Sequence, residues 1–245
     1  MMEFAKKLEQ KSKDLKGQPS PTIAVIGDSI TQGCFEVYTT GPNSLETVFE
    51  PEKAYGVRLK ELLHILYPNV PIQLIPAGIS GDSAAGGVKR LERDVLRFHP
   101  DLTVVAFGTN DAAGNGVEGI ASYGENLRYM FRELKKDGGE VIFLTQVFMN
   151  TKTSPHLKEE LFLKLAEQFA KVQNSGLLKA YYEEGKRIAK EEGVLVCDLY
   201  SVWEAMSNAG VDTTALLSNH LNPPLREYHY YIAIKLLEMI LGVQL

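Results

Sequence analysis

The strongest indication of the fold is the segment Thr22-Ile23-Ala24-Val25-Ile26-Gly27-Asp28-Ser29. A short, continuous apolar run of this kind suits a strand that is buried on both faces of a parallel sheet. The polar triplet that follows places a serine where the strand ends and a loop begins. Because ligands of parallel α/β sheets bind beyond the carboxyl ends of the strands, the stretch predicts a polar site at one sheet edge.

Four later segments are predicted as further strands, at residues 70–76, 102–107, 140–145 and 194–199. Between the strands, apolar residues recur at helical spacing. That spacing predicts helices at residues 55–66, 88–98, 120–136, 202–209 and 227–241, and one or two helices over 157–192 that are interrupted near 174–176. Strands that alternate with helices in this way indicate an α/β fold, a parallel sheet with helices on both faces.

No low-complexity or Pro/Gly/Ser-rich linker divides the 245 residues, so residues 22–245 are expected to form one domain. Residues 1–21 are expected to form an N-terminal extension, with a loosely packed helix over residues 3–16 that ends before two prolines. The extension lacks the apolar stretch of a signal peptide, and no apolar run reaches the roughly 18 residues that span a bilayer. We therefore expect a cytoplasmic location and no membrane partner.

The net charge of −5 arises from 31 acidic and 26 basic residues, and the basic residues form no run. Proteins that bind nucleic acid usually concentrate basic charge on one face, so no nucleic-acid partner is expected. The apolar residues of the last predicted helix would serve a homo-oligomer or the core of the domain equally well.

The two cysteines, Cys34 and Cys197, are too few for a disulfide framework and form no C-x-x-C pair, so we expect buried, reduced thiols. His64, His99 and His156 have no partner at metal-ligand spacing, and no metal site is predicted. The glycine-rich stretches at residues 78–87 and 108–116 lack the Lys-Ser/Thr ending of a phosphate loop and the spacing of a dinucleotide site. No cofactor is expected.

Three polar clusters follow the first three predicted strands. Ser29 could act as a nucleophile if a base and oxyanion donors lie near it, although a serine at this position is also a common helix N-cap. Gly81, within Ala77-Gly78-Ile79-Ser80-Gly81-Asp82-Ser83, could offer its backbone N–H to an anion or could be a turn glycine. Asn110, within Gly108-Thr109-Asn110-Asp111, could donate to the same anion or could cap a helix. Their occurrence in order, each at a strand end, favours a shared site.

Together these clusters resemble the blocks of the SGNH (GDSL-type) hydrolase family, and the resemblance covers about residues 22–240. It implies that Ser29 is the catalytic nucleophile. It also implies an oxyanion hole formed by the backbone N–H groups of Ser29 and Gly81 and the side chain of Asn110. The implied fold is a three-layer α/β/α sandwich with five parallel strands in a flavodoxin-like arrangement.

The fourth block of the family departs from the expected pattern in this chain. The family usually shows an Asp, two residues and then the catalytic His, but here Leu217 precedes His220 by three positions. In one interpretation His220 is the base, oriented by Asp212 or by a backbone carbonyl. In the other, the base position falls at Pro223, and the protein is an impaired member that binds acylated ligands. His220 could also be a loop histidine that caps a backbone group. His229 is expected to be a packing residue or a residue that supports the site without touching the substrate.

The resemblance implies an ester hydrolase that works through an acyl-enzyme on Ser29. The family includes lipases, thioesterases and esterases that remove acetyl groups from carbohydrates. A long loop at residues 31–52, together with residues 146–156, is expected to shape the pocket. The mix of Thr, Asn, Glu and Phe in these segments favours a small acyl ester, such as an acetylated carbohydrate, over a long fatty chain.

Overall fold

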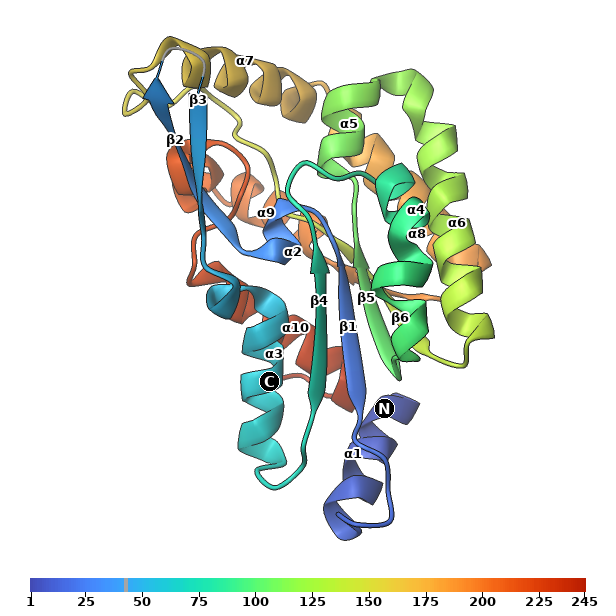
Figure 1. The fold of residues 1–245 in the computed structure, drawn as a ribbon. Coiled ribbons are helices and arrows are strands. Elements are labelled where there is room, and N and C mark those ends of the chain that lie inside the picture. Colours follow the sequence, from blue (N-terminus) through green and yellow to red (C-terminus); the bar gives the residue numbers. More distant parts are fainter. Residues whose placement is uncertain (42–43) are drawn as a thin grey trace.

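The computed structural model describes residues 1–41 and 44–245, and its centre is a parallel sheet of five strands. The strand order in that sheet is β4-β1-β5-β6-β7 (Figure 1). The bounds are β1 (Thr22–Gly27), β4 (Gln73–Gly78), β5 (Leu102–Ala106), β6 (Glu140–Thr145) and β7 (Leu195–Asp198). This is the flavodoxin-like order, and it confirms the fold predicted from the sequence.

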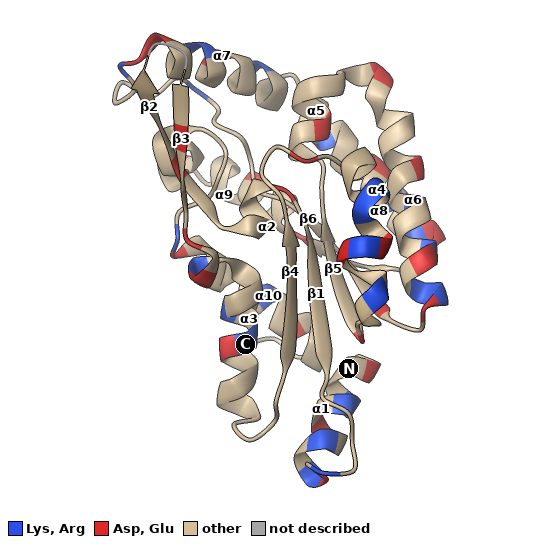
Figure 2. Cartoon of the chain, viewed as in Figure 1, with Lys and Arg blue, Asp and Glu red and all other residues tan. Residues whose placement is uncertain are grey.

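Two layers of helices cover the sheet, one on each face (Figure 1). The helices of one layer are α4 (Ala84–Asp94), α6 (Ile120–Lys136) and α8 (Leu177–Glu191). The helices of the other are α1 (Glu3–Lys13), α3 (Tyr55–Leu66) and α10 (Tyr228–Leu241). Because both faces are covered, the residues of β5 are buried without alternation, as the apolar run predicted. Figure 2 shows that charged residues lie mostly on the outer helices and leave the strands largely uncharged.

Most predicted elements are found within a few residues of their expected bounds. The predicted helices at residues 55–66 and 120–136 and the strand at 140–145 agree with α3, α6 and β6. The predicted helix at 157–192 is two helices, α7 (Glu160–Asn174) and α8, separated by Gly176 in the left-handed region. The helix predicted at 202–209 is α9 (Leu199–Asn208).

The prediction of a long loop at residues 31–52 is wrong. The chain there forms the end of a short helix, α2 (Ser29–Gln32), and then an antiparallel hairpin of β2 (Cys34–Gly41) and β3 (Ser44–Phe49). Its Val, Tyr, Thr and Phe side chains favour strands, whereas the prediction gave more weight to the turn residues. Pro42 and Asn43, which belong to that prediction, lie outside the described residues. A short helix, α5 (Thr109–Asn115), also follows β5 where no helix was predicted.

Helix α1 packs closely rather than loosely, because Phe4 and Leu8 are fully buried in the core that the sheet and helices share. The carboxylate of Glu140, at the start of β6, accepts hydrogen bonds from the backbone N–H groups of Glu3 and Phe4. Within the described ranges, no helix is long and apolar enough to cross a membrane.

Candidate active site

The three predicted strand-end residues lie at one edge of the sheet. Ser29, Gly81 and Asn110 follow β1, β4 and β5, and β1 is paired with both of the other strands. A backbone hydrogen bond of 3.0 Å from Ile79 N to the carbonyl of Gly27 joins the first two strand ends. The topology therefore brings together the three residues that the sequence grouped.

Ser29 is the first residue of α2 and is nearly buried. The preceding Asp28 caps the helix, since its Oδ1 accepts a hydrogen bond of 3.0 Å from Ile30 N. Gly33, with a φ of 88°, ends the helix after one turn. At the first helical position, the N–H of Ser29 has no acceptor within the helix and is available to a bound anion.

A buried polar network surrounds Asp28, the residue before Ser29. Gln146 Nε2 donates to Asp28 Oδ1 at 2.7 Å, and Gln146 Oε1 accepts from Thr109 Oγ1 at 2.6 Å and from the Tyr182 hydroxyl at 3.3 Å. Burial raises the pKa of Asp28 to about 7, although its hydrogen bonds from Gln146 and Ile30 act in the opposite direction. The strand-end rule could have identified Gln146, because it directly follows the predicted fourth strand.

The turn that contains Gly81 is fixed by a buried arginine that sequence reasoning missed. Gly81 has a φ of 77°, which favours glycine, and no atom lies within 4 Å of where its Cβ would be. Its neighbour Asp82 forms a 2.7 Å ion pair with Arg90. The Arg90 guanidinium also donates to the carbonyls of Ala77 at 2.7 Å and Gly27 at 3.0 Å. Arg90 thus joins the ends of β1 and β4 to the turn.

Asn110 lies in the first turn of α5, and its Nδ2 donates to the carbonyl of Asp82 at 2.8 Å. An amide nitrogen carries two N–H groups, so one remains for a ligand. The next residue, Asp111, accepts from Ala84 N at 3.1 Å, and burial raises its pKa to about 6. Asn110 is thereby held next to the turn that contains Gly81.

His220 lies on a separate loop, in the 3₁₀ turn η5 (Ser218–His220). Its Nδ1 is 3.4 Å from the carbonyl oxygen of Thr214, and its ring stacks on His156 at a centroid distance of 5.4 Å. Among the described residues, no hydrogen bond joins an imidazole to Ser29 Oγ. The role of His220 as the base therefore stays a prediction.

The other residues considered for the base have different surroundings. Asp212 forms a 2.6 Å ion pair with Lys152 at the surface. Pro223 is buried, and its carbonyl accepts a hydrogen bond of 2.8 Å from Ser218 N. His229 is fully buried, and its Nδ1 accepts a hydrogen bond of 3.0 Å from Tyr55 N. His229 is thus a packing residue, as expected, and burial lowers its pKa to about 3.

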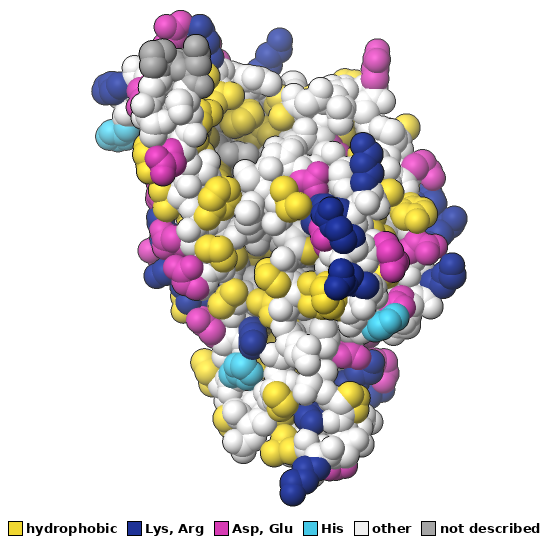
Figure 3. Space-filling model, viewed as in Figure 1, with side chains coloured by type: hydrophobic (Ala, Val, Ile, Leu, Met, Phe, Trp, Pro, Cys, Tyr) yellow, Lys and Arg dark blue, Asp and Glu magenta, His cyan; other side chains and the backbone are white. Residues whose placement is uncertain are grey.

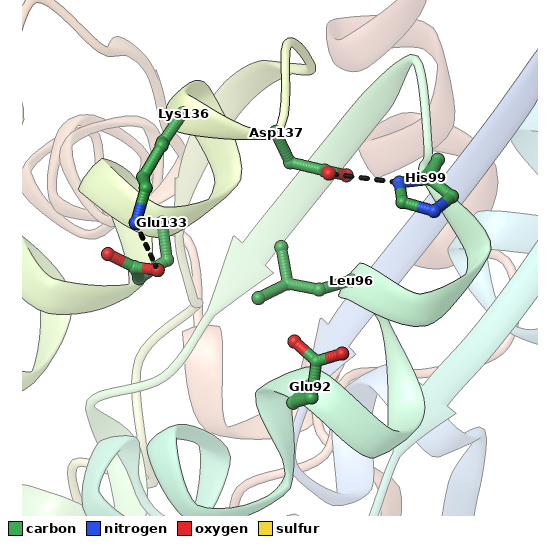
Figure 4. Close-up of a pocket in the computed structure, with 6 residues that line it drawn as sticks. All are labelled: Glu92, Leu96, His99, Glu133, Lys136 and Asp137. Atoms are coloured by element: carbon green, nitrogen blue, oxygen red, sulfur yellow. Dashed lines mark hydrogen bonds and ion pairs between the residues drawn. The ribbon is translucent and has the colours of Figure 1, made fainter.

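Three hollows of the surface are lined by residues other than Ser29, Gly81 and Asn110. A pocket of about 220 Å³ between α4 and α6 is lined by residues that include His99 and Asp137 (Figure 4). These two residues precede β5 and β6, so the pocket lies near the amino ends of the strands, opposite Ser29. Hollows of about 610 and 390 Å³ flank the edge strand β4, where Figure 3 shows hydrophobic side chains at the surface. Ser29, Gly81 and Asn110 line none of these three.

Both cysteines are buried and unbonded, and burial raises the pKa of Cys34 to about 11 and that of Cys197 to about 12. Within the part of the chain that the structure describes, no three His, Cys, Asp or Glu side chains are grouped so that they could hold a metal ion.

The chain belongs to the GDSL-like lipase/acylhydrolase family, whose sequence model matches residues 25–224. An acetylxylan esterase of Geobacillus stearothermophilus is 34% identical over 89 residues, which are 36% of this chain and 39% of that protein. Esterase TesA of Pseudomonas aeruginosa is 28% identical over 125 residues, which are 50% of this chain and 53% of that protein. The matches thus span about half, or less, of the length of these curated relatives.

Solved structures share the fold. A lipase/acylhydrolase from Enterococcus faecalis superposes with a TM-score of 0.66 at 22% identity, covering 91% of this chain and 96% of that one. The acetylxylan esterase Axe2 from Geobacillus stearothermophilus gives a TM-score of 0.64 at 22% identity, covering 90% of this chain and 94% of that one. These likenesses support the three-layer α/β/α architecture.

Proposed function

We propose that the protein is a carboxylic ester hydrolase that acts through an acyl-enzyme on Ser29. The observation that carries the proposal is the meeting of three groups at the carboxyl ends of adjacent strands. Ser29 follows β1 and Asn110 follows β5, and these two strands are paired. The hydrogen bond from Asn110 to the carbonyl of Asp82 joins Asn110 to the turn that contains Gly81. Family membership supports the same chemistry.

In the proposed reaction, Ser29 Oγ attacks the acyl carbonyl carbon, and the serine proton passes to the base. The backbone N–H groups of Ser29 and Gly81 and the remaining amide N–H of Asn110 donate to the oxyanion. The intermediate collapses as the base returns the proton to the leaving alcohol. Water then attacks the acyl-enzyme with help from the same base, which releases the acid and restores Ser29.

We assign the base to His220 and its orientation to the carbonyl of Thr214. A carbonyl can only accept, so the contact with Nδ1 favours the tautomer with a proton on Nδ1 and a free lone pair on Nε2. That lone pair is what a serine proton requires. Asp212 is a poorer candidate for the orienting group, because Lys152 already pairs with its carboxylate.

For the substrate, we propose a small acyl ester such as an acetylated carbohydrate. The polar character of residues 146–156 supports a short acyl group. Relatives named as acetylxylan esterases point to the same class. A cytoplasmic location and a homo-oligomer remain predictions of the sequence.

A second candidate function is that of a binding protein for acylated ligands. The absence, among the described residues, of a hydrogen bond between Ser29 Oγ and any imidazole is consistent with it, although the relatives named as esterases do not favour it. Catalytic hydrogen bonds are often long in unliganded enzymes, however, so this observation weighs less than the strand-end constellation.

Hydrolysis of p-nitrophenyl acetate and of acetylated xylooligosaccharides, by wild type, Ser29→Ala and His220→Ala, separates these functions. We expect turnover by wild type, a fall of about 10³-fold or more in both variants, and weaker activity on p-nitrophenyl esters with long acyl chains. Wild-type turnover no faster than that of Ser29→Ala would favour the binding protein. Full activity of His220→Ala would remove His220 as the base while leaving Ser29 in place.

A further inference from the structure

We propose that the β2–β3 hairpin orients His220, with Asn219 and Arg226 as positioning residues; this inference rests on the proposed function. The loop that carries His220, residues 213–226, is called the histidine loop below. The hairpin contacts that loop at two points, one on each side of His220, and its base is attached to the turn of the nucleophile.

The hairpin begins and ends beside Ser29. Gly33, at its base, donates its N–H to the carbonyl of Ser29 at 3.0 Å and accepts from Glu50 N at 2.8 Å. The left-handed backbone of Gly33 brings the two strands this close, since a Cβ there would lie 2.8 Å from the carbonyl oxygen of Glu50. The position of the hairpin is therefore set by the same helix, α2, that presents the nucleophile.

The first contact lies directly before His220. Asn219 Oδ1 accepts a hydrogen bond of 2.7 Å from Val37 N, on strand β2. Asn219 and His220 are both in the left-handed region, with φ values of 52° and 54°. The left-handed region is unfavourable for residues with a Cβ, so surrounding contacts must hold the pair in place. The bond from the hairpin is one such contact.

The second contact lies six residues after His220. Arg226 Nε donates to Glu50 Oε1 at 2.9 Å, and another guanidinium nitrogen donates to Glu36 Oε2 at 2.6 Å. The guanidinium carbon also lies 4.6 Å from the centre of the Phe35 ring. Glu36 and Phe35 belong to β2 and Glu50 follows β3, so Arg226 ties the end of the histidine loop to both sides of the hairpin.

Apolar contacts reinforce these polar ones. Leu221, next to His220, is buried with Phe162 and Ala166 of α7, and Val37 of the hairpin packs against the same cluster. The carbonyl of Leu221 also accepts a hydrogen bond of 2.7 Å from Asn150 N. Figure 1 shows the hairpin and α7 together beyond the carboxyl end of the sheet.

The combination accounts for the orientation of a histidine that contacts no carboxylate among the described residues. The carbonyl of Thr214 fixes the tautomer. The hairpin holds the backbone before and after His220. It thereby maintains the left-handed conformation that sets the direction of the imidazole ring. A change in Asn219 or Arg226 should therefore act on catalysis through His220.

The test compares Asn219→Gly, Arg226→Met and the control Arg187→Met. Asn219→Gly removes the acceptor but tolerates the left-handed backbone, and Arg187 is an exposed residue of α8 with two ion pairs of its own. With p-nitrophenyl acetate, we expect kcat to fall by about 10–100-fold in the first two, with KM little changed, because a misplaced catalytic group costs about this much. Arg226→Lys should recover part of the loss, and the control should match wild type.

A double-mutant comparison separates positioning from general damage. If Arg226 acts through His220, Arg226→Met should cause no further loss of kcat in the His220→Ala background. A further loss of 10-fold or more there would contradict the proposal, as would wild-type kcat in both Asn219→Gly and Arg226→Met while His220→Ala is inactive.

Hydrogen exchange provides a readout that does not depend on activity. In Arg226→Met and Asn219→Gly, the amides of residues 213–221 should exchange faster than in wild type, while those of β5 should not change. If His220→Ala is fully active, the proposed base fails whatever the exchange data show. If exchange in the histidine loop is unchanged, the hairpin does not hold the loop and the further inference fails by itself.

Discussion

Replacing Gly78 with Ala tests how closely helix α2, which begins with Ser29, packs against the end of strand β4. Gly78 ends β4, and a Cβ there would lie 2.4 Å from Gln32 N and 2.7 Å from the carbonyl carbon of Thr31. Both atoms belong to the backbone of α2, so no side-chain rotation relieves the clash. Ordinary contact requires about 3.5 Å, and α2 must therefore move by about 1 Å.

Ser29 begins α2, so the same displacement moves this proposed nucleophile relative to the proposed oxyanion donors, Gly81 and Asn110. A misplacement of about 1 Å costs about 100-fold in rate, and we expect kcat for p-nitrophenyl acetate to fall by about that factor. Circular dichroism and thermal unfolding establish whether the variant is folded. Gly78→Ala should fold with a lowered Tm, because the strand end and the helix no longer pack together.

Gly114→Ala is the matched control. No atom lies within 4 Å of where its Cβ would be, and the residue lies in the described helix α5. We expect wild-type kcat and a gain of up to about 1 kcal/mol in stability, the helix preference of Ala over Gly. A folded Gly78→Ala variant with wild-type kcat would refute the reasoning, since it would mean that α2 does not rest on the end of β4 or that Ser29 takes no part in the reaction.

Three further predictions concern single side chains. Asn110→Ala should lower kcat by about 10²–10³-fold with little change in KM, because an oxyanion donor is lost; an unchanged kcat in steady-state assays would exclude that role. Burial raises the pKa of Asp28 from its ordinary value of 3.8 to about 7, so the protonated side chain favours the folded state. As pH rises from 4 to 7, the free energy of unfolding of wild type, measured in urea, should fall by up to about 4 kcal/mol relative to that of Asp28→Asn. If the free energies of unfolding of the two proteins change in parallel with pH, the pKa of Asp28 is not raised. Asp212→Asn should retain wild-type kcat in the same assay, because the carbonyl of Thr214 and not Asp212 orients His220; a loss of 10-fold or more would restore Asp212 to that role.

The central strands β1, β5 and β6 could be predicted from the sequence because they are buried on both faces, and such burial leaves nearly continuous apolar runs. The hairpin could not, since most of its residues are exposed or half-buried and therefore form no continuous apolar run. Helix α2 also escaped prediction, because a single helical turn has too few residues to show a periodicity.

The candidate site likewise contains some residues whose positions could be predicted from the sequence and others whose positions could not. The common location of Ser29, Gly81 and Asn110 could be predicted because each lies within a few residues of a strand's carboxyl end, and parallel topology brings such positions together. Arg90 reaches the site from the middle of a polar helix face, where nothing in the sequence distinguishes it from a surface arginine. The contact of His220 with Thr214 depends on two left-handed residues, which no apolar pattern reveals.

Covalent labelling with a fluorophosphonate shows whether Ser29 is the nucleophile. Such a reagent phosphonylates an activated serine with loss of fluoride, and mass spectrometry of the digested protein locates the adduct. We predict one adduct per chain, on the peptide that contains Ser29, and none with Ser29→Ala. Labelling at another residue, or equal labelling of Ser29→Ala, would contradict the account.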